Sequence, residues 1–405
     1  MIGITRLLCG GAFTGDTMRY EKGAIPNLAG VGPGRGPVVV WNATRRCNLR
    51  CIHCYADANT PGGEELTPAE GLALIDDLAG FQVPVLLLSG GEPLLRPDFF
   101  DLVGYAGQKG LRVTISTNGT LIDREVAGRL KQAGVGYVGI SLDGLAEQND
   151  FFRGHKGAFT AALAGIRHCR DAGQKMGLRL TLSRHNFQQL PDIMKLVEEE
   201  HIPRVCFYHL VYAGRGSSLQ EDDLSGAETR TALDQIMDWV EDMERRGVGR
   251  EVLTVDNHAD AVYLYLRLKQ RNPERAALIW PLLLANGGNR SGIAIGQVDW
   301  SGTVHPDQFS AAHPLGNVRE RPFSAIWSDS SQPLLHMLRH RREYLKGRCA
   351  GCRWLDICNG NFRARAETAG HPPEVGPDFW QADPACYLTD GEIGPRDTDR
   401  EQRGN

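Results

Sequence analysis

The chain has 405 residues, and its 45 Lys and Arg residues against 49 Asp and Glu residues give a net charge of −4. A hydrophobic content of 41% allows a sizeable core and excludes a disordered or fibrous chain. No block of like charges and no apolar segment of membrane-spanning length is present, which disfavours nucleic acid and membrane as partners. The apolar start of the chain is followed by no convincing cleavage site, so we expect a soluble, cytoplasmic protein of roughly two or three domains.

Short apolar runs alternate with amphipathic helical stretches from Pro37 to about Tyr208. This alternation predicts an α/β fold with a parallel sheet and right-handed crossovers. Six strand–helix units fall short of a closed barrel, so we expect an open, partial (β/α)6 barrel. The six predicted strands are VVVWN (38–42), VPVLLLS (83–89), LRVTIS (111–116), GYVGISL (136–142), KMGLRLTL (175–182) and RVCFYHL (204–210).

Glycine and polar residues follow most of these strands. The first strand is followed by RRCNLRCIHCY, the second by GGEP, the third by TNG and the fourth by DG. Parallel α/β folds place their chemistry at the carboxyl ends of the strands. The sequence therefore predicts a functional site at this edge of the sheet.

The rest of the chain divides by pattern into further regions. Residues 291–306 alternate like a two-stranded hairpin around a turn at Asp299–Gly302. We expect an N-terminal segment (1–36), the barrel (37–215), a helical connecting region (216–290) and a small C-terminal metal-binding domain (291–405).

Two groups of cysteines stand out among the ten in the chain. Cys47, Cys51 and Cys54 offer three thiolates on one loop, which would leave one iron of a cubane iron–sulfur cluster without a protein ligand. A zinc loop completed by His53 is the alternative. The tail offers a closed set of four thiolates, which suits either a cluster or zinc: Cys349, Cys352, Cys358 and Cys386. Cys9, Cys169 and Cys206 stand alone and are expected to be buried hydrophobic residues.

The motif CNLRCIHC, together with GGEP at 90–93 and the partial barrel, resembles the signature of radical S-adenosylmethionine (SAM) enzymes. The resemblance implies a 4Fe–4S cluster on the three loop cysteines and SAM bound at its open iron. It further implies that Gly90, Gly91 and Glu92 surround the methionine amine, and that Tyr55 packs near the adenine or supports the loop. Carboxylate and ribose contacts are implied for Ser116, Asn118, Ser141, Asp143 and Arg184, although Asn-Gly and Asp-Gly are also common turns.

The tail resembles the C-terminal SPASM or twitch domain of this enzyme family through Gly316–Glu320 and Ile326-Trp327. It departs from the full SPASM pattern, because Phe362 stands where another cysteine would follow Cys358 and His305-Pro306-Asp307 contains no cysteine. We therefore expect one auxiliary 4Fe–4S cluster, and two clusters in the whole chain.

Segments along the whole chain resemble the radical SAM proteins of haem d1 biosynthesis that are encoded with nitrite reductase. These segments include PVVVWNATRRCNLRCIHCYADA, CRWLDICNGNFRARAE and DPACYLTDGEIG. The resemblance implies an iron-containing tetrapyrrole substrate, 12,18-didecarboxysirohaem, which loses two propionates on the way to the haem d1 used in denitrification. It also implies a low-potential electron donor of the flavodoxin or ferredoxin type.

Several alternatives stay open at this point. Relatives in the alternative haem pathway decarboxylate propionates, as in conversion of coprohaem to protohaem, or remove acetates, and other enzymes with this tail modify peptides. A module that only relays electrons is disfavoured, because such a carrier would normally ligate all four irons. Arg215 and Arg19 are candidate anchors for substrate carboxylates, whereas His209, His305 and His313 are expected to be structural.

Overall fold

A single curved sheet of eleven strands organises the protein, in the order β1-β8-β7-β6-β5-β4-β3-β2-β9-β10-β11. The computed structural model describes residues 1–21, 36–60, 62–368 and 377–394. Much of the expected N-terminal segment (22–35) and the last residues of the tail (395–405) lie outside this part. The six predicted strands are all present and pair in parallel in chain order, which confirms the α/β class: β2 (Val38–Thr44), β3 (Leu86–Gly90), β4 (Val113–Thr117), β5 (Tyr137–Ser141), β6 (Met176–Leu182) and β7 (Arg204–His209).

The sheet extends past the predicted barrel at both edges. The strand β8 (Glu251–Val255) adds in parallel to β7 although it lies inside the region expected to be a helical connection, and β1 (Ile2–Gly3) pairs antiparallel with it. At the other edge, β9 (Ile295–Val298) pairs in parallel with β2. The predicted hairpin is present as β9 and β10 (Thr303–His305), and β11 (Gly316–Asn317) adds a strand that we did not predict.

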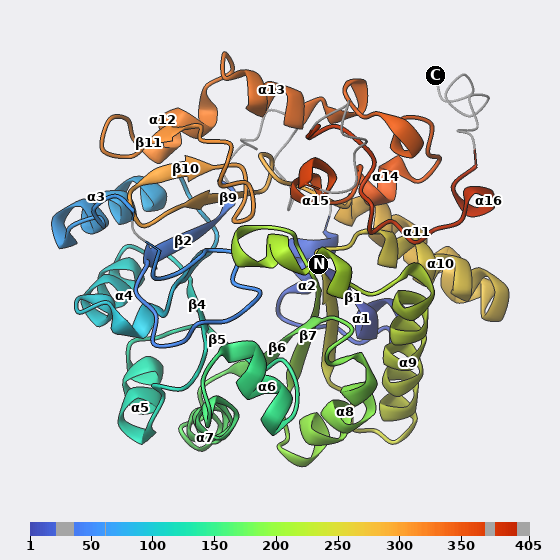
Figure 1. Ribbon diagram of the computed structural model, residues 1–405, viewed down its shortest axis with the longest axis horizontal. Helices are drawn as coiled ribbons and strands as arrows, with labels where there is room; N and C mark the ends of the chain where they lie inside the picture. The colour runs from blue at the N-terminus through green and yellow to red at the C-terminus, as the bar shows by residue number, and fades with distance from the viewer. Residues whose placement is uncertain (22–35, 61, 369–376, 395–405) are drawn as a thin grey trace.

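Helices cover the outer face of the sheet (Figure 1). This layer consists of α3 (Pro68–Gly80), α4 (Phe99–Gln108), α5 (Arg124–Gln132), α6 (Ala146–Arg153), α7 (Ala158–Asp171), α8 (Leu190–Glu199) and α9 (Gly226–Arg245). The sequence sets where they begin: Thr67 caps α3 in a capping box with Glu70, and Ser225 caps α9 in the same way with Glu228.

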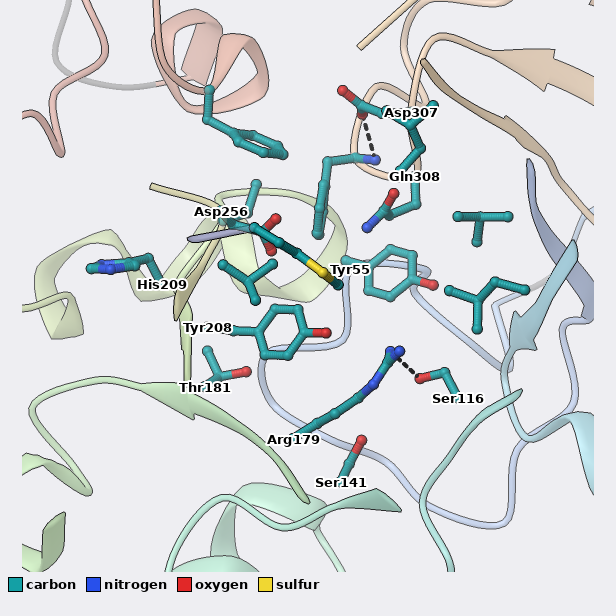
Figure 2. Close-up of a pocket in the computed structure, with 18 of the residues that line it drawn as sticks. Tyr55, Ser116, Ser141, Arg179, Thr181, Tyr208, His209, Asp256, Asp307 and Gln308 are labelled. Atoms are coloured by element: carbon teal, nitrogen blue, oxygen red, sulfur yellow. Dashed lines mark hydrogen bonds between the residues drawn. The ribbon is translucent and has the colours of Figure 1, made fainter. Parts of the chain in front are cut away.

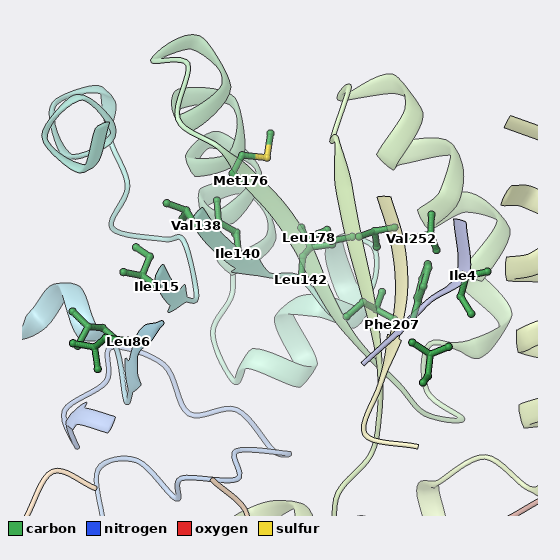
Figure 3. Close-up of a cluster of buried hydrophobic side chains, with 14 of the residues drawn as sticks. Ile4, Leu86, Ile115, Val138, Ile140, Leu142, Met176, Leu178, Phe207 and Val252 are labelled. Atoms are coloured by element: carbon green, nitrogen blue, oxygen red, sulfur yellow. The ribbon is translucent and has the colours of Figure 1, made fainter. Parts of the chain in front are cut away.

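The main core lies between the strands and these helices. Figure 3 shows Leu86, Ile115, Val138, Leu178 and Phe207 from five neighbouring strands in this layer. Each is fully buried, and burying such a side chain contributes about 1.5–3 kcal/mol. Polar side chains of the same strands, such as Ser116 and Arg179, line the cavity instead.

The C-terminal region lies over the carboxyl ends of the strands, at the top of Figure 1. A fully buried ion pair between Arg365 and Asp383 fastens it, and Arg365 also donates to the main-chain oxygens of Leu210 and Asp256 beyond β7 and β8. The remaining elements are α1 (Ile4–Cys9), α2 (Asp16–Tyr20), α10 (Ala259–Arg271), α11 (Pro273–Asn286), α12 (Phe323–Ser328), α13 (Pro333–Arg339), α14 (Leu355–Cys358), α15 (Arg363–Thr368) and α16 (Asp390–Ile393), together with five short 3-10 turns. Among the described residues, no helix is both long and apolar enough to cross a membrane.

Candidate functional site

A cavity of about 430 Å³ opens at the carboxyl ends of the strands, within the size range of ligand sites. Figure 2 shows side chains from several strands pointing into it, among them Ser116 of β4, Ser141 of β5, and Arg179 and Thr181 of β6. Asp307, Gln308, Phe309 and Phe362 line it from the C-terminal region. The barrel and the C-terminal region therefore form this cavity together.

The three loop cysteines all line the cavity. The main-chain N–H of Leu49 donates to the sulfur of Cys47 at 3.4 Å, and the guanidinium of Arg153 donates to the sulfur of Cys51 at 3.5 Å. Burial raises the pKa of Cys47 to about 11, and a bound metal centre would favour its thiolate form. In the described part of the chain, no group of three or more His, Cys, Asp and Glu residues is placed to hold a single metal ion. Three thiolates from one loop fit a 4Fe–4S cluster in which one iron has no protein ligand.

His53, the proposed fourth ligand of a zinc loop, is held by a carboxylate. Its Nε2 lies 3.2 Å from Asp143, and Arg153 forms an ion pair with the same carboxylate. Burial alone would raise the pKa of Asp143, but the charges of Arg153 and His53 outweigh it and lower this pKa to about 2. Asp143 thus organises the floor of the site beneath the cysteine loop.

Glycines at the end of β3 let the main chain approach the cysteine loop closely. The N–H of Gly91 donates to Thr44 O at 2.7 Å, and the N–H of Glu92 donates to Arg46 O at 2.8 Å. Gly90 has a φ of +129°, and a Cβ at Gly91 would lie 2.1 Å from the oxygen of Arg46. The GGE motif is therefore built against the residues that lead into Cys47.

Replacing Gly91 by Ala should displace this loop, because the backbone of Arg46 would have to shift. We expect a loss of about 1–3 kcal/mol of stability and less iron bound at the first cysteine group. Gly104→Ala in α4 is a matched control, because a Cβ there meets nothing within 4 Å, and it should stabilise the protein slightly. Iron content and thermal unfolding measure both effects, and equal iron in the two variants would contradict the prediction.

Glu92 is fully buried and accepts hydrogen bonds from three donors. They are the hydroxyl of Thr117 at 2.8 Å, the main-chain N–H of Asn118 at 2.8 Å and that of Leu94 at 3.2 Å. Burial outweighs these donors and raises its pKa to about 7. A cationic amine beside Glu92 would favour the ionised carboxylate.

This raised pKa predicts a pH-dependent stability. The folded protein keeps a proton on Glu92 that the unfolded chain releases above its ordinary pKa of 4.5. The contribution of Glu92 to the free energy of unfolding is therefore complete below about pH 4.5. It falls by roughly 3 kcal/mol as the pH rises from there through about 7. Thermal unfolding without SAM should depend less on pH between 5 and 8 in Glu92→Gln than in the wild type, and identical slopes would show that Glu92 is not the cause.

Several of the other expected SAM contacts line the cavity. Ser116, Ser141 and Asn118 line the cavity, and the amide of Asn118 donates to Asn48 beside Cys47 at 2.8 Å. Tyr55 donates to Asn42 and shares a hydrogen bond with Ser89, each at 3.1 Å, so its hydroxyl ties the cysteine loop to β2 and β3. This position agrees with support of the loop, and the Tyr55 ring also lines the cavity.

Arg184 does not reach the cavity, which corrects the expectation from the sequence. Its half-exposed side chain pairs with Glu228 at 3.3 Å and donates to Glu221 O at 2.9 Å. It lies just past the end of β6, where the chain has turned outward toward α9. The arginines that line the cavity from this side are Arg153 and Arg179, neither of which was singled out from the sequence.

The candidate substrate anchors are already engaged. Arg215 donates to Cys51 O at 2.8 Å and pairs with Asp57 at 2.8 Å, so it fastens the cysteine loop. Arg19 lies between Asp16 and Glu251, at 2.9 Å and 2.5 Å. His209 is bonded to Asp260 at 2.9 Å, His313 to Glu367 at 2.9 Å and His305 to Asp299 at 3.4 Å, as expected for structural histidines.

The four tail cysteines converge in a second, enclosed cavity. Cys349, Cys352, Cys358 and Cys386 all line it, under Trp354 and Leu388. Burial raises the pKa of Cys386 to about 11, and that of Cys358 well above its ordinary value. Four thiols gathered in a dry enclosure fit a closed metal centre with no open coordination position.

An aromatic chain connects the first site to the C-terminal region. Tyr55 contacts Phe309 with ring centroids 5.1 Å apart, and Phe309 contacts Phe362 at 5.2 Å. Phe362, at the position where another cysteine was considered, thus faces the first cavity.

Comparison with known proteins agrees with this architecture. The model of the radical SAM superfamily matches residues 41–197, and that of the SPASM iron–sulfur cluster-binding domain matches residues 295–353. The chain is 54% identical to the Fe-coproporphyrin III synthase of Methanosarcina barkeri (strain Fusaro / DSM 804), over 97% of this chain and 99% of that one. It is 44% identical to the pre-heme d1 synthase of Dinoroseobacter shibae, over 88% of each chain.

A solved structure shares the fold. Streptococcus suis SuiB bound to S-adenosylmethionine aligns with a TM-score of 0.67 at 16% identity, covering 88% of this chain and 78% of that one. The extensive sequence identity to the two relatives and the two matched domains identify the cofactors as 4Fe–4S clusters and SAM. The chain therefore belongs to the radical SAM superfamily, as an enzyme with a C-terminal SPASM iron–sulfur domain.

Proposed function

We propose that this enzyme removes carboxylate-bearing side chains from an iron tetrapyrrole derived from sirohaem, and that these side chains are acetates, which gives Fe-coproporphyrin III. The observation that carries the proposal is the 54% identity to an Fe-coproporphyrin III synthase over nearly the whole of both chains. A cavity of about 430 Å³ lined by the three loop cysteines supports it, because the reacting carbon must lie next to the cluster-bound SAM.

In this proposal Cys47, Cys51 and Cys54 hold the catalytic cluster. When bound, that cluster supplies the electron that cleaves SAM, which provides a radical able to take hydrogen from an unactivated C–H group. Gly90 and Gly91 line the cavity and leave room for the methionine end of SAM, and Tyr55 holds the loop. Glu92, buried behind these glycines and outside the cavity lining, is proposed to stabilise the cationic amine by its charge. Ser116, Asn118, Ser141 and Asp143 are proposed as the other polar contacts, from the ends of β4 and β5.

The chain's further task is to exclude water from the reacting carbon. Tyr55, Phe309 and Phe362 form a continuous aromatic wall between the cysteine loop and the C-terminal region. A wall of this kind keeps water from quenching a reactive carbon centre.

The tail is proposed to hold the second cluster on Cys349, Cys352, Cys358 and Cys386, within a C-terminal domain that spans 291–405. The catalytic barrel is proposed to span 37–215, with β8 from the connecting region completing its edge. A low-potential donor of the flavodoxin or ferredoxin type would supply the electron.

Loss of propionates on the way to haem d1 is the second candidate function. Its support is the 44% identity to a pre-heme d1 synthase over 88% of each chain. The two candidates differ in which side chain leaves, so both can be tested on 12,18-didecarboxysirohaem, which carries acetates and propionates.

The test is mass spectrometry of the tetrapyrrole extracted after anaerobic incubation with SAM and a reductant. We expect loss of acetate carbon with every propionate intact. Loss of propionate carbon would assign the haem d1 reaction, and vinyl groups formed from coprohaem would assign the protohaem branch. No change to any of these tetrapyrroles, with 5′-deoxyadenosine still formed, would contradict the proposal and favour a peptide substrate.

A further inference from the structure

The cavity of the first site is unusually rich in arginine, and most of these side chains are already neutralised. Three of the arginines that line the cavity form ion pairs with carboxylates: Arg153 with Asp143, Arg215 with Asp57, and Arg19 with Asp16 and Glu251. Two cavity-lining arginines have no such partner in the part of the chain that the structure describes. They are Arg179 and Arg290.

Arg179 lies in the middle of β6 and points into the cavity (Figure 2). Its Nη1 donates to Ser116 Oγ at 2.9 Å, while its buried Nε has no hydrogen-bond partner among the described residues. The side chain crosses Gly139 of β5, where a Cβ would lie 2.3 Å from Nε. The sheet therefore leaves space for this guanidinium, although burying a charge without a counterion is costly.

Arg290 lies in the segment between α11 and β9 and lines the same cavity. It donates only to main-chain oxygens at the end of α11, to Asn286 O at 2.9 Å and Ala285 O at 3.4 Å. Gly287 has a φ of +62°, and a Cβ there would lie 2.3 Å from Nη2. Burial lowers the pKa of Arg290 to about 10, as expected for a cation without a nearby anion.

The surroundings of Arg290 add to its positive charge. Arg341, fully buried behind it, donates to Asn289 Oδ1 at 2.7 Å and Ser291 O at 2.8 Å and has no carboxylate within ion-pair distance among the described residues. Asp307 lines the same cavity, but its carboxylate accepts hydrogen bonds from Ser291 and Ser310 and from the main chain of Phe309. This wall therefore presents a guanidinium with no carboxylate of the described residues within ion-pair distance.

We infer that Arg179 and Arg290 bind two carboxylate side chains of the tetrapyrrole, one from β6 and the other from the segment before β9. The inference rests on the proposed function and extends it to the residues that recognise the substrate. A substrate with several carboxylates around a flat ring supplies the anions that the two guanidinium groups lack, and the planar fork of each arginine suits a carboxylate. The two contacts would fix the rotation of the ring, and so choose which side chain faces the cluster.

The experiment measures binding, not turnover. Anaerobic protein with its clusters is titrated with Fe-coproporphyrin III and with its tetramethyl ester, which has the same ring but no carboxylate charge, and the visible absorption band reports binding. The variants are Arg179→Gln and Arg290→Gln, with Arg179→Lys and Arg290→Lys as conservative replacements. Arg245→Gln, at an exposed arginine on α9, is the matched control. SAM affinity is measured in parallel by equilibrium dialysis.

Each glutamine variant should bind the free acid about 30-fold more weakly or worse, while the ester, the control and SAM affinity change little. The lysine variants should recover part of the loss, because they restore charge without the fork. If the glutamine variants lost affinity equally for the acid and the ester, or lost none, the inference would be overturned. Binding of the free acid by the wild type would still support the proposed function. A selective loss of SAM affinity in Arg179→Gln would also overturn it, because that result assigns Arg179 to SAM. Failure of the wild type to bind either porphyrin would overturn the proposed function and this inference together.

Discussion

Replacing Cys47, Cys51 and Cys54 together by alanine is expected to reduce reductive cleavage of SAM to the background level. The three sulfurs line one cavity and are supplied by a single loop, so no other described cysteine is placed to substitute for them. The loop itself should persist, because Arg215 fastens it to Asp57 and Tyr55 ties it to β2 and β3. Chromatographic assay of 5′-deoxyadenosine after anaerobic reduction measures the effect.

A matched control removes the same number of thiols elsewhere. Cys9, Cys169 and Cys206 are packed among hydrophobic side chains and line neither cavity. Their triple alanine variant should lose some stability, roughly 1 kcal/mol per site, but keep its iron and its SAM cleavage. Wild-type formation of 5′-deoxyadenosine by the Cys47, Cys51 and Cys54 variant would refute the assignment of the catalytic cluster.

The sheet shows which features a sequence can predict and which it cannot. The six central strands were predictable because each is a short segment rich in apolar and β-branched residues, with a helix before the next strand. The strand β8 was missed because it follows the 20-residue helix α9, in a region whose pattern reads as a helical connection. The parallel pairing of β9 with β2 joins residues far apart in sequence, and no local pattern encodes such a pairing.

The site shows the same division. The cysteines and the GGE motif were found because their spacing is local to one loop and one strand end. Arg153 carried no signal, because its role depends on the main-chain pairing of 50–52 with 152–153, which only the fold creates. The sequence did contain a signal for Arg179, which was overlooked. An arginine flanked by leucines in a buried strand must point toward a cavity or a counterion. Arg184, chosen instead, is a polar residue past the strand end that the turn directs to solvent.

The auxiliary site leads to the second large expected effect. Replacing Cys349, Cys352, Cys358 and Cys386 by alanine should remove about half of the iron, from about eight to about four atoms per chain. The first site shares no cysteine with this cavity, so the SAM-dependent signal of the catalytic cluster should remain. The variant of Cys47, Cys51 and Cys54 should lose the other half of the iron. Each variant is thus the control for the other.

The loss of the tail thiolates should also lower the unfolding temperature, because binding a metal centre in this small enclosure contributes directly to folding there. The effect should be local, since the buried Arg365–Asp383 pair and its bonds to Leu210 and Asp256 hold the segment on the barrel without using a cysteine. Iron and acid-labile sulfide analysis, with electron paramagnetic resonance in the presence and absence of SAM, measures both results. Stoichiometric zinc in anaerobically purified wild-type protein, with iron confined to the first site, would refute the auxiliary cluster. The four sulfurs would then hold a structural ion that takes no part in electron transfer.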